Sequence, residues 1–163
     1  MRQLAALFLV IGSVASLPSM IHARSRQAAA PARPSACAVL TRDVVSQTTP
    51  YSKQQLELVL MAKPSEDPVG RSGSACSYGG VTLQIDPFAW ATVEKTSEKG
   101  WTPLQGVGDA AYFRDNRGEW AELAVRAGQR VLTIQMDIPD GRTALQVQPH
   151  AIALAKAVLP KLN

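Results

Sequence analysis

The segment GVGDAAYFRD, residues 106–115, has a spacing that binds a cofactor in other settings. Gly106, Gly108 and Ala111 follow the G-x-G-x-x-A pattern with which dinucleotide-binding folds hold a pyrophosphate. That chemistry needs a buried strand before the glycines and a helix after them. Here Pro103 interrupts any strand before the glycines, and the residues after them predict a strand. We therefore expect no cofactor and interpret the glycines as a turn that enters a strand.

The same region contains candidate binding residues of another kind: Trp101, Asp109, Tyr112 and Arg114. They combine aromatic rings, a carboxylate and a guanidinium at a glycine-hinged corner that we expect to be exposed. The alternative is structural, with Trp101 and Tyr112 covering a sheet edge and Asp109 bonding the turn backbone. A second group near two predicted hairpin ends, for which we favour a solvated rim, consists of Arg114, Arg117, Arg126 and Arg130.

Catalytic groups are scarce. The sequence has two histidines, His22 and His150, and no G-x-S-x-G motif, so a Ser-His-Asp hydrolase is not expected. A structural zinc site lacks the four thiolate or imidazole donors it needs, so we expect no metal. Paired carboxylates could hydrolyse a glycan, although solvated strand positions are the favoured interpretation. The candidate pairs are Asp109 with Asp115 and Glu119 with Glu122.

The N-terminus predicts export. Arg2 precedes an uncharged apolar run, residues 4–17, which is shorter than the roughly 20 residues of a membrane span. We expect a signal peptide over residues 1–23, with later cleavage near residues 28–30 or an uncleaved anchor as alternatives. No cysteine directly follows the run, so lipidation is not expected. Residues 24–36 are rich in Ala and Pro and predict a flexible tether.

The charge of the chain is concentrated in that N-terminal part. The formal net charge is +4, but four of the 17 basic residues precede Cys37, which leaves thirteen basic and thirteen acidic residues in the rest. The predicted domain is therefore close to neutral. Without a basic stripe interleaved with aromatics, nucleic acid is not an expected partner.

Cys37 and Cys76 are the two cysteines of the chain. In an oxidising compartment an even pair of cysteines most simply forms one disulfide. This bond would close a loop of about 39 residues and stabilise the fold by roughly 4 kcal/mol.

The first half of the predicted domain shows mixed patterns. Thr41 can cap a short helix over residues 42–47 that Pro50 ends. Residues 52–63 suit a helix or a strand, with helix favoured. Residues 64–75 are rich in Pro, Ser and Gly and predict an exposed loop.

The second half has clearer signals. Residues 81–85 alternate as a half-buried strand, after which Asp86 could cap a helix that has Pro87 at its first position and ends near Gly100. Three strands then form a meander over about residues 110–138. An apolar helix over about residues 148–158 closes the chain, with Pro149 in its first turn.

These patterns predict one α+β domain over residues 37–163, with an antiparallel sheet of about four strands, helices on one face and one disulfide. The stretches CAVLTRD, Cys76-Ser77-Tyr78 and GVGDAAYF, followed by two strands and an Ala-rich helix, resemble small exported bacterial domains of unknown function. Among these are actinobacterial lipoproteins and, more distantly, extracellular sensor domains of Ser/Thr kinases. The resemblance implies a disulfide-linked α+β domain whose ligand is unknown, with no catalytic residues to transfer.

By elimination, we expect a periplasmic or secreted, non-enzymatic binding or inhibitory domain that acts on an envelope or secreted protein. The alternatives are a hydrolase of envelope polymers that uses carboxylates and a structural component of the envelope. Once the signal peptide is cleaved, no stable membrane insertion is expected.

Overall fold

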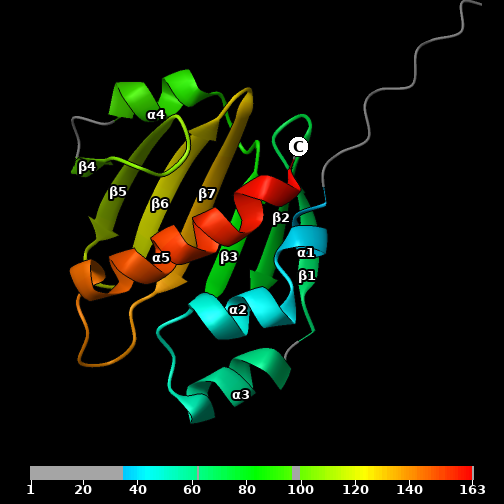
Figure 1. Cartoon of the computed structure of the whole chain (residues 1–163), viewed down its shortest axis with the longest axis vertical. Coiled ribbons are helices and arrows are strands. Elements are labelled where there is room, and N and C mark those ends of the chain that lie inside the picture. Colours follow the sequence, from blue (N-terminus) through cyan, green and yellow to red (C-terminus); the bar gives the residue numbers. More distant parts are fainter. Residues whose placement is uncertain (1–34, 62, 97–99, 163) are drawn as a thin grey trace, which may run out of the picture. The chain divides into compact units, whose positions relative to one another are not determined.

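Seven strands form one antiparallel sheet in the part of the chain that the structure, a computed structural model, describes: residues 35–61, 63–96 and 100–162. The strand order is β1-β2-β3-β7-β6-β5-β4 (Figure 1). The predicted signal peptide, and the predicted tether up to residue 34, lie outside the described residues. The mixed α+β class is confirmed.

The strands are β1 Ser65–Val69, β2 Gly73–Tyr78, β3 Val81–Ile85, β4 Trp101–Leu104, β5 Ala110–Asn116, β6 Trp120–Ala127 and β7 Arg130–Asp137. The helices are α1 Ala36–Val39, α2 Arg42–Thr48, α3 Lys53–Met61, α4 Trp90–Thr96 and α5 Ala144–Val158, followed by the 3-10 turn η1 Leu159–Lys161. The predicted meander corresponds to β5, β6 and β7 and is confirmed.

The prediction of about four strands was wrong because three strands carry weak local signals. The predicted loop over residues 64–75 contains β1 and the start of β2. Pro68 in β1 and Pro103 in β4 both lie in strands at the two ends of the sheet. Proline is tolerated in an edge strand because its missing N–H can face away from the neighbour. Pro103 accordingly pairs with Tyr112 of β5 and does not interrupt the strand.

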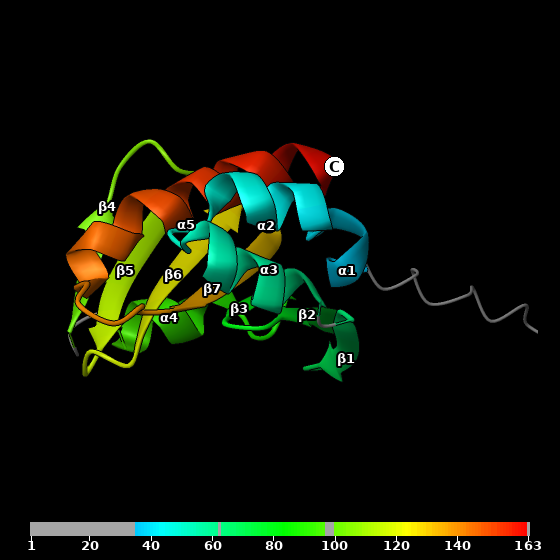
Figure 2. The same ribbon diagram turned by 90° about the horizontal axis from the view of Figure 1, so that it is seen from below.

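Helices cover both faces of the sheet, not the single face that the sequence predicted. Helices α1, α2 and α5 lie on one face, and α4 lies on the other (Figure 2). The main core fills the first face, where Leu83, Leu123 and Ile134 are fully buried. A smaller cluster lies beneath α4, where Trp90 and Val93 pack with residues of β6 and β7.

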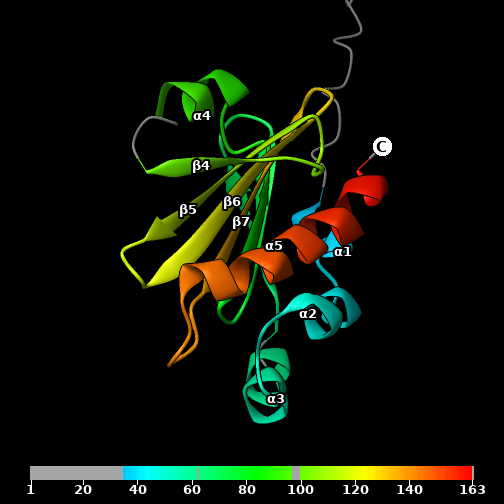
Figure 3. The same ribbon diagram turned by 60° about the vertical axis from the view of Figure 1, so that its left-hand side comes forward.

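The alternation of the central strands explains why the main core forms. Register pairs such as Leu83 with Ile134 and Leu123 with Ile134 put apolar side chains of neighbouring strands on one face. Helix α5 contributes Ala151, Leu154 and Ala155, all fully buried, to the same layer. The small alanine side chains let the helix approach the sheet closely. Figure 3 shows α5 crossing the strands diagonally.

Helix α5 begins at Ala144, four residues before the predicted start. The Gln146 side chain accepts a hydrogen bond of 2.9 Å from the N–H of Thr143, which satisfies a free donor at this helix end. Pro149 therefore lies inside the helix, where it removes one backbone hydrogen bond. Packing of the apolar stripe on the sheet outweighs this local cost.

Side-chain hydrogen bonds mark where helices α2 and α3 begin. The Thr41 hydroxyl accepts a hydrogen bond from the Val44 N–H at 3.4 Å, which confirms the predicted start of α2. The segment that suited a helix or a strand is the helix α3, with reciprocal bonds between Ser52 and Gln55 at its N-terminus. No helix in the described ranges has the length and apolar character that a membrane span requires.

The predicted disulfide is confirmed. Cys37 and Cys76 are bonded, with an S–S distance of 2.00 Å and a Cα–Cα distance of 5.0 Å. The bond joins α1 to β2, and Cys76 is fully buried. The N-terminal helix is thus covalently attached to the sheet.

Candidate functional site

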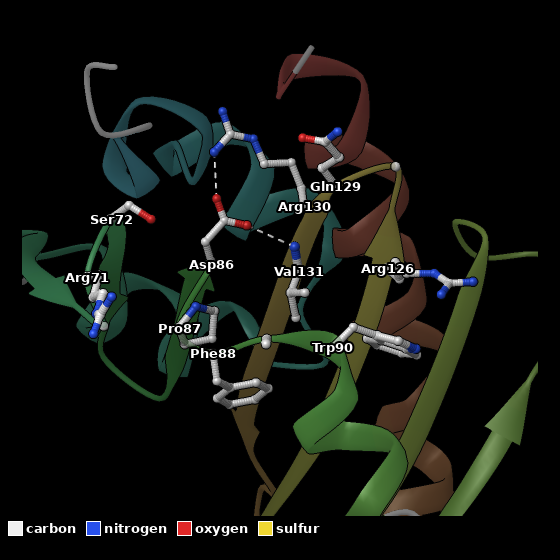
Figure 4. Close-up of a pocket in the computed structure, with 13 residues that line it drawn as sticks. Arg71, Ser72, Asp86, Pro87, Phe88, Trp90, Arg126, Gln129, Arg130 and Val131 are labelled. Carbon is white, nitrogen blue, oxygen red and sulfur yellow. Dashed lines mark hydrogen bonds and ion pairs between the residues drawn. The ribbon is translucent and has the colours of Figure 1, made fainter. Parts of the chain in front are cut away.

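Three loops at one end of the central strands surround a cavity of about 940 Å³ (Figure 4). They are the β1–β2 turn, the β3–α4 connection and the β6–β7 turn. We call this site the arginine cavity. It is lined by Gly70, Arg71, Ser72, Asp86, Pro87, Phe88, Ala89, Trp90, Arg126, Gly128, Gln129, Arg130 and Val131.

Sheet topology brings these loops together although they are far apart in the sequence. In the order β1-β2-β3-β7-β6, the β1–β2 turn, the end of β3 and the β6–β7 turn all lie at the same end of the strands. Gly70 has a φ of +57°, and a Cβ there would lie 2.8 Å from the Pro87 carbonyl oxygen. A glycine is therefore needed for the first turn to lie against the β3–α4 connection.

Asp86 fixes the centre of the cavity. Its carboxylate accepts a hydrogen bond of 2.9 Å from the Val131 N–H and forms an ion pair of 2.5 Å with Arg130. Its N–H donates to the Val131 carbonyl oxygen at 2.6 Å. Asp86 has a φ of +51°, in the left-handed region that a non-glycine residue rarely adopts. These three interactions with β7 hold it there.

The predicted cap at Asp86 was therefore wrong. The helix was expected to place Pro87 at its first position, yet α4 begins at Trp90. Pairing of Asp86 with Arg130 and Val131 takes the carboxylate away from the helix end. The result is an extended connection, which carries Pro87 and Phe88 along the wall of the cavity.

The charge in the cavity is unbalanced. Three arginines, Arg71, Arg126 and Arg130, line it together with one acidic residue, Asp86. The lining thus has a formal charge of +2 at neutral pH. The Asp86 carboxylate bonds both Arg130 and the Val131 N–H.

Aromatic rings provide the apolar part of the site. The Trp90 ring lies 5.6 Å from the Arg126 guanidinium carbon, and its Nε1 donates to Glu94 at 2.7 Å. Phe88 is 37% exposed and therefore open to contact. Figure 4 shows both rings on the side of the cavity away from the Asp86–Arg130 pair. The site joins cationic groups to a fixed apolar surface.

Three of the four predicted binding residues lie on one sheet face beside α4. Trp101 pairs with Arg114 across β4 and β5, and the Arg114 guanidinium carbon lies 4.5 Å from the Trp101 ring. The Tyr112 ring lies 5.7 Å from that of Trp90. Arg114 also donates to Glu122, which is only 4% exposed, at 2.8 Å through Nε. These contacts are internal, which is the structural alternative raised from the sequence.

Asp109, the fourth predicted binding residue, belongs to a turn. Its carboxylate accepts from the Gly128 N–H at 2.7 Å, and its own N–H donates to the Arg126 carbonyl oxygen at 2.8 Å. Asp109 thereby supports the β6–β7 turn that borders the arginine cavity. It does not line the cavity itself.

The glycines of residues 106–115 lie between β4 and β5, so their interpretation as a turn that enters a strand is confirmed. Gly106 and Gly108 have φ values of +75° and +59°. A Cβ at Gly108 would lie 2.4 Å from the Arg126 carbonyl oxygen. Close approach of two backbones requires this glycine.

The carboxylates considered for glycan hydrolysis are largely engaged within the fold. Asp115 accepts from the Gly118 N–H at 2.7 Å, while Asp109 and Glu122 have the partners described above. Within the described ranges, no group of three or more His, Cys, Asp or Glu side chains is placed to hold a metal ion.

Sequence reasoning grouped Arg126 and Arg130 as a solvated rim but did not connect them with Arg71, Phe88 and Trp90. Two members of that predicted group, Arg114 and Arg117, do not line the cavity. The one local signal for this cavity was the pair of aromatic residues in the segment DPFAW. That segment fits the start of a helix equally well.

No family model matches the chain, and the chain has no significant match among curated proteins or solved structures. The resemblance to small exported domains therefore stays a prediction, and the functional argument rests on the geometry of the site.

Proposed function

We propose that this protein is an exported, non-enzymatic binding domain whose arginine cavity holds an acidic segment of an envelope or secreted protein. The observation that carries the proposal is the lining of the cavity by three arginines and one acidic residue whose carboxylate is already bonded. Guanidinium groups present several donors in a planar fork, which suits carboxylates.

The shape of the cavity supports a segment with an apolar residue beside its acidic ones. A volume of about 940 Å³ is large enough for several side chains. Phe88 and Trp90 offer an apolar wall next to the arginines. We therefore expect an acidic sequence that includes one aromatic or large aliphatic residue.

The proposed location supports a protein partner outside the cytosol. The N-terminal pattern predicts a signal peptide, and the Cys37–Cys76 bond is typical of proteins from oxidising compartments. Envelope and secreted proteins are the macromolecules that such a domain meets.

Peptide binding tests the proposal. The probe is the peptide Ac-Glu-Glu-Phe-Glu-Glu-NH₂, measured by isothermal titration against its Gln-Gln-Phe-Gln-Gln counterpart. The acidic peptide should bind more tightly, and added salt should weaken it because these charges are partly solvated. The double variant Arg71→Gln/Arg126→Gln should lose about tenfold in affinity, since hydrogen bonds between charged groups contribute about 1.5 kcal/mol.

Arg142→Gln is the matched control, because this exposed arginine lies outside the cavity lining. It changes the net charge without changing the site and should leave the affinity within about twofold. Equal binding of both peptides, or an unchanged affinity of the double variant, would overturn the proposal.

A further inference from the structure

A second cavity, of about 330 Å³, lies at the end of β3 and β7 opposite to the arginine cavity. Helix α3 and the segment before it form one side of the cavity, and the β2–β3 turn and the end of β7 form the other. We call it the Tyr51–Asp137 cavity. It is lined by Tyr51, Gln55, Leu58, Val59, Gly80, Asp137, Ile138, Pro139 and Asp140.

Two polar groups lie close to Gly80 in this cavity. A Cβ at Gly80 would lie 2.5 Å from an Asp137 carboxylate oxygen and 2.6 Å from the Tyr51 hydroxyl oxygen. Only a residue without a side chain leaves this space open. The Tyr51 hydroxyl and the Asp137 carboxylate therefore pack directly against the Gly80 backbone at this end of the cavity.

The Tyr51 hydroxyl has an unusual environment. It is buried, and it has no hydrogen-bond partner among the described residues. Buried polar groups are nearly always bonded, so an unpaired hydroxyl calls for an explanation. Asp137 is close enough for its charge to raise the pKa of the Tyr51 hydroxyl further.

The charge of this lining is negative. Asp137 and Asp140 are acidic, and no Lys, Arg or His side chain lines the cavity. Val59, Ile138 and Leu58 supply an apolar wall, and Leu58 is 66% exposed. An anionic ligand would be repelled here, whereas a cation with an aliphatic stem would match both parts.

We propose that the Tyr51–Asp137 cavity binds a protonated primary amine on an aliphatic chain. The ammonium group donates to the Asp137 carboxylate, which lines the cavity. The alkyl chain lies against Val59 and Ile138. Such an amine belongs either to a lysine side chain of a protein or to a free alkylamine, and both present the same chemistry.

The pKa values of both polar groups are shifted by burial. Burial raises the pKa of the Asp137 carboxyl above its usual range. Burial, and then the charge of Asp137, raise the pKa of the Tyr51 hydroxyl. An ammonium beside Asp137 would oppose the first of these shifts by favouring the ionised carboxyl.

A metal ion fits the cavity less well. The lining provides two carboxylates, and no grouping of three or more His, Cys, Asp or Glu ligands is found among the described residues. Calcium takes six to eight oxygen ligands, so two carboxylates leave most positions unfilled.

Titration of the isotope-labelled protein, followed by amide chemical shifts, tests the amine site. The probes are n-pentylamine and, as the protein-derived form, Nα-acetyl-lysine methylamide. Saturable shifts are expected at the Gly80 and Asp137 amides, with a Kd on the order of 1 mM for such small probes. Stronger binding of the lysine derivative would identify a protein partner, and stronger binding of pentylamine a free amine.

n-Pentanol and n-pentanoate are the matched ligands, and neither should bind comparably because neither carries a positive charge. Asp137→Asn should weaken amine binding at least about tenfold. Glu57→Gln, an exposed change on α3 outside the lining, should leave it within about twofold. Circular dichroism verifies that each variant is folded.

The proposal is overturned if pentanol shifts the same amides as strongly as pentylamine, or if Asp137→Asn binds the amine as well as the wild type. Absence of any shift at Gly80 and Asp137 would also refute it. These outcomes do not depend on the arginine cavity, because no lining residue is shared between the two sites.

Discussion

Reduction of the Cys37–Cys76 bond should lower the free energy of unfolding by about 4 kcal/mol at 25 °C. The two cysteines are separated by 39 residues. In the chain-entropy model, closing a loop of about that length removes roughly 13 cal/mol/K from the unfolded chain, which gives this value. Typical domains have a total stability of about 5–15 kcal/mol, so the reduced protein should stay folded with a narrow margin.

Urea unfolding, followed by tryptophan fluorescence and circular dichroism, measures the effect with and without a phosphine reductant. The variant Cys37→Ala/Cys76→Ala is the comparison, and reductant should not change it. This variant also loses the fully buried Cys76 sulfur, so its stability should fall somewhat below that of the reduced wild type. The m-value should rise on reduction, because the unfolded chain then exposes more surface.

A loss smaller than about 1 kcal/mol would refute this reasoning. It would mean that residues 37–76 remain restricted in the unfolded state without the bond. An unchanged m-value in the same experiment would support that conclusion.

Two further predictions concern charged groups. Arg114→Leu should lower the free energy of unfolding by about 2 kcal/mol, because it leaves the buried Glu122 carboxylate unpaired, whereas Arg114→Leu/Glu122→Leu should lie within about 1 kcal/mol of the wild type in urea. Equal losses in both variants would contradict this. Because burial raises the pKa of Asp137, its protonated form favours folding, and this stability is lost as the pH rises through the raised pKa. Asp137→Asn should therefore raise Tm at neutral pH but not in acid, and a constant Tm difference would be the opposing result.

The sequence determined those elements whose signals are local. The alternation of β3, β6 and β7 identified them as strands, and the hydroxyl of Thr41 marked the start of α2. The cysteine pair, together with a predicted export signal, was enough to predict the disulfide. The strands and the helix start depend on residues that are neighbours in sequence. The disulfide depends on the tendency of two cysteines to pair in an oxidising compartment.

The candidate sites could be found only in the tertiary structure, because their residues are far apart in the sequence. The arginine cavity joins residues 70–72, 86–90 and 126–131, which only the sheet order brings together. Tyr51 and Asp137 are brought close to Gly80 in the same way. No local pattern records such distances, and so neither cavity could be read from the sequence.

Tertiary contacts also overruled local preferences at single residues. Asp86 follows a strand and precedes Pro87, which predicts a helix cap, yet pairing with Arg130 and Val131 binds its carboxylate more firmly. Pro149 is accepted inside α5 because the helix buries its apolar stripe on the sheet. The sequence thus determined the α+β fold class, the disulfide and the strands with clear alternation. Long-range packing decided which side chains come together at the two cavities.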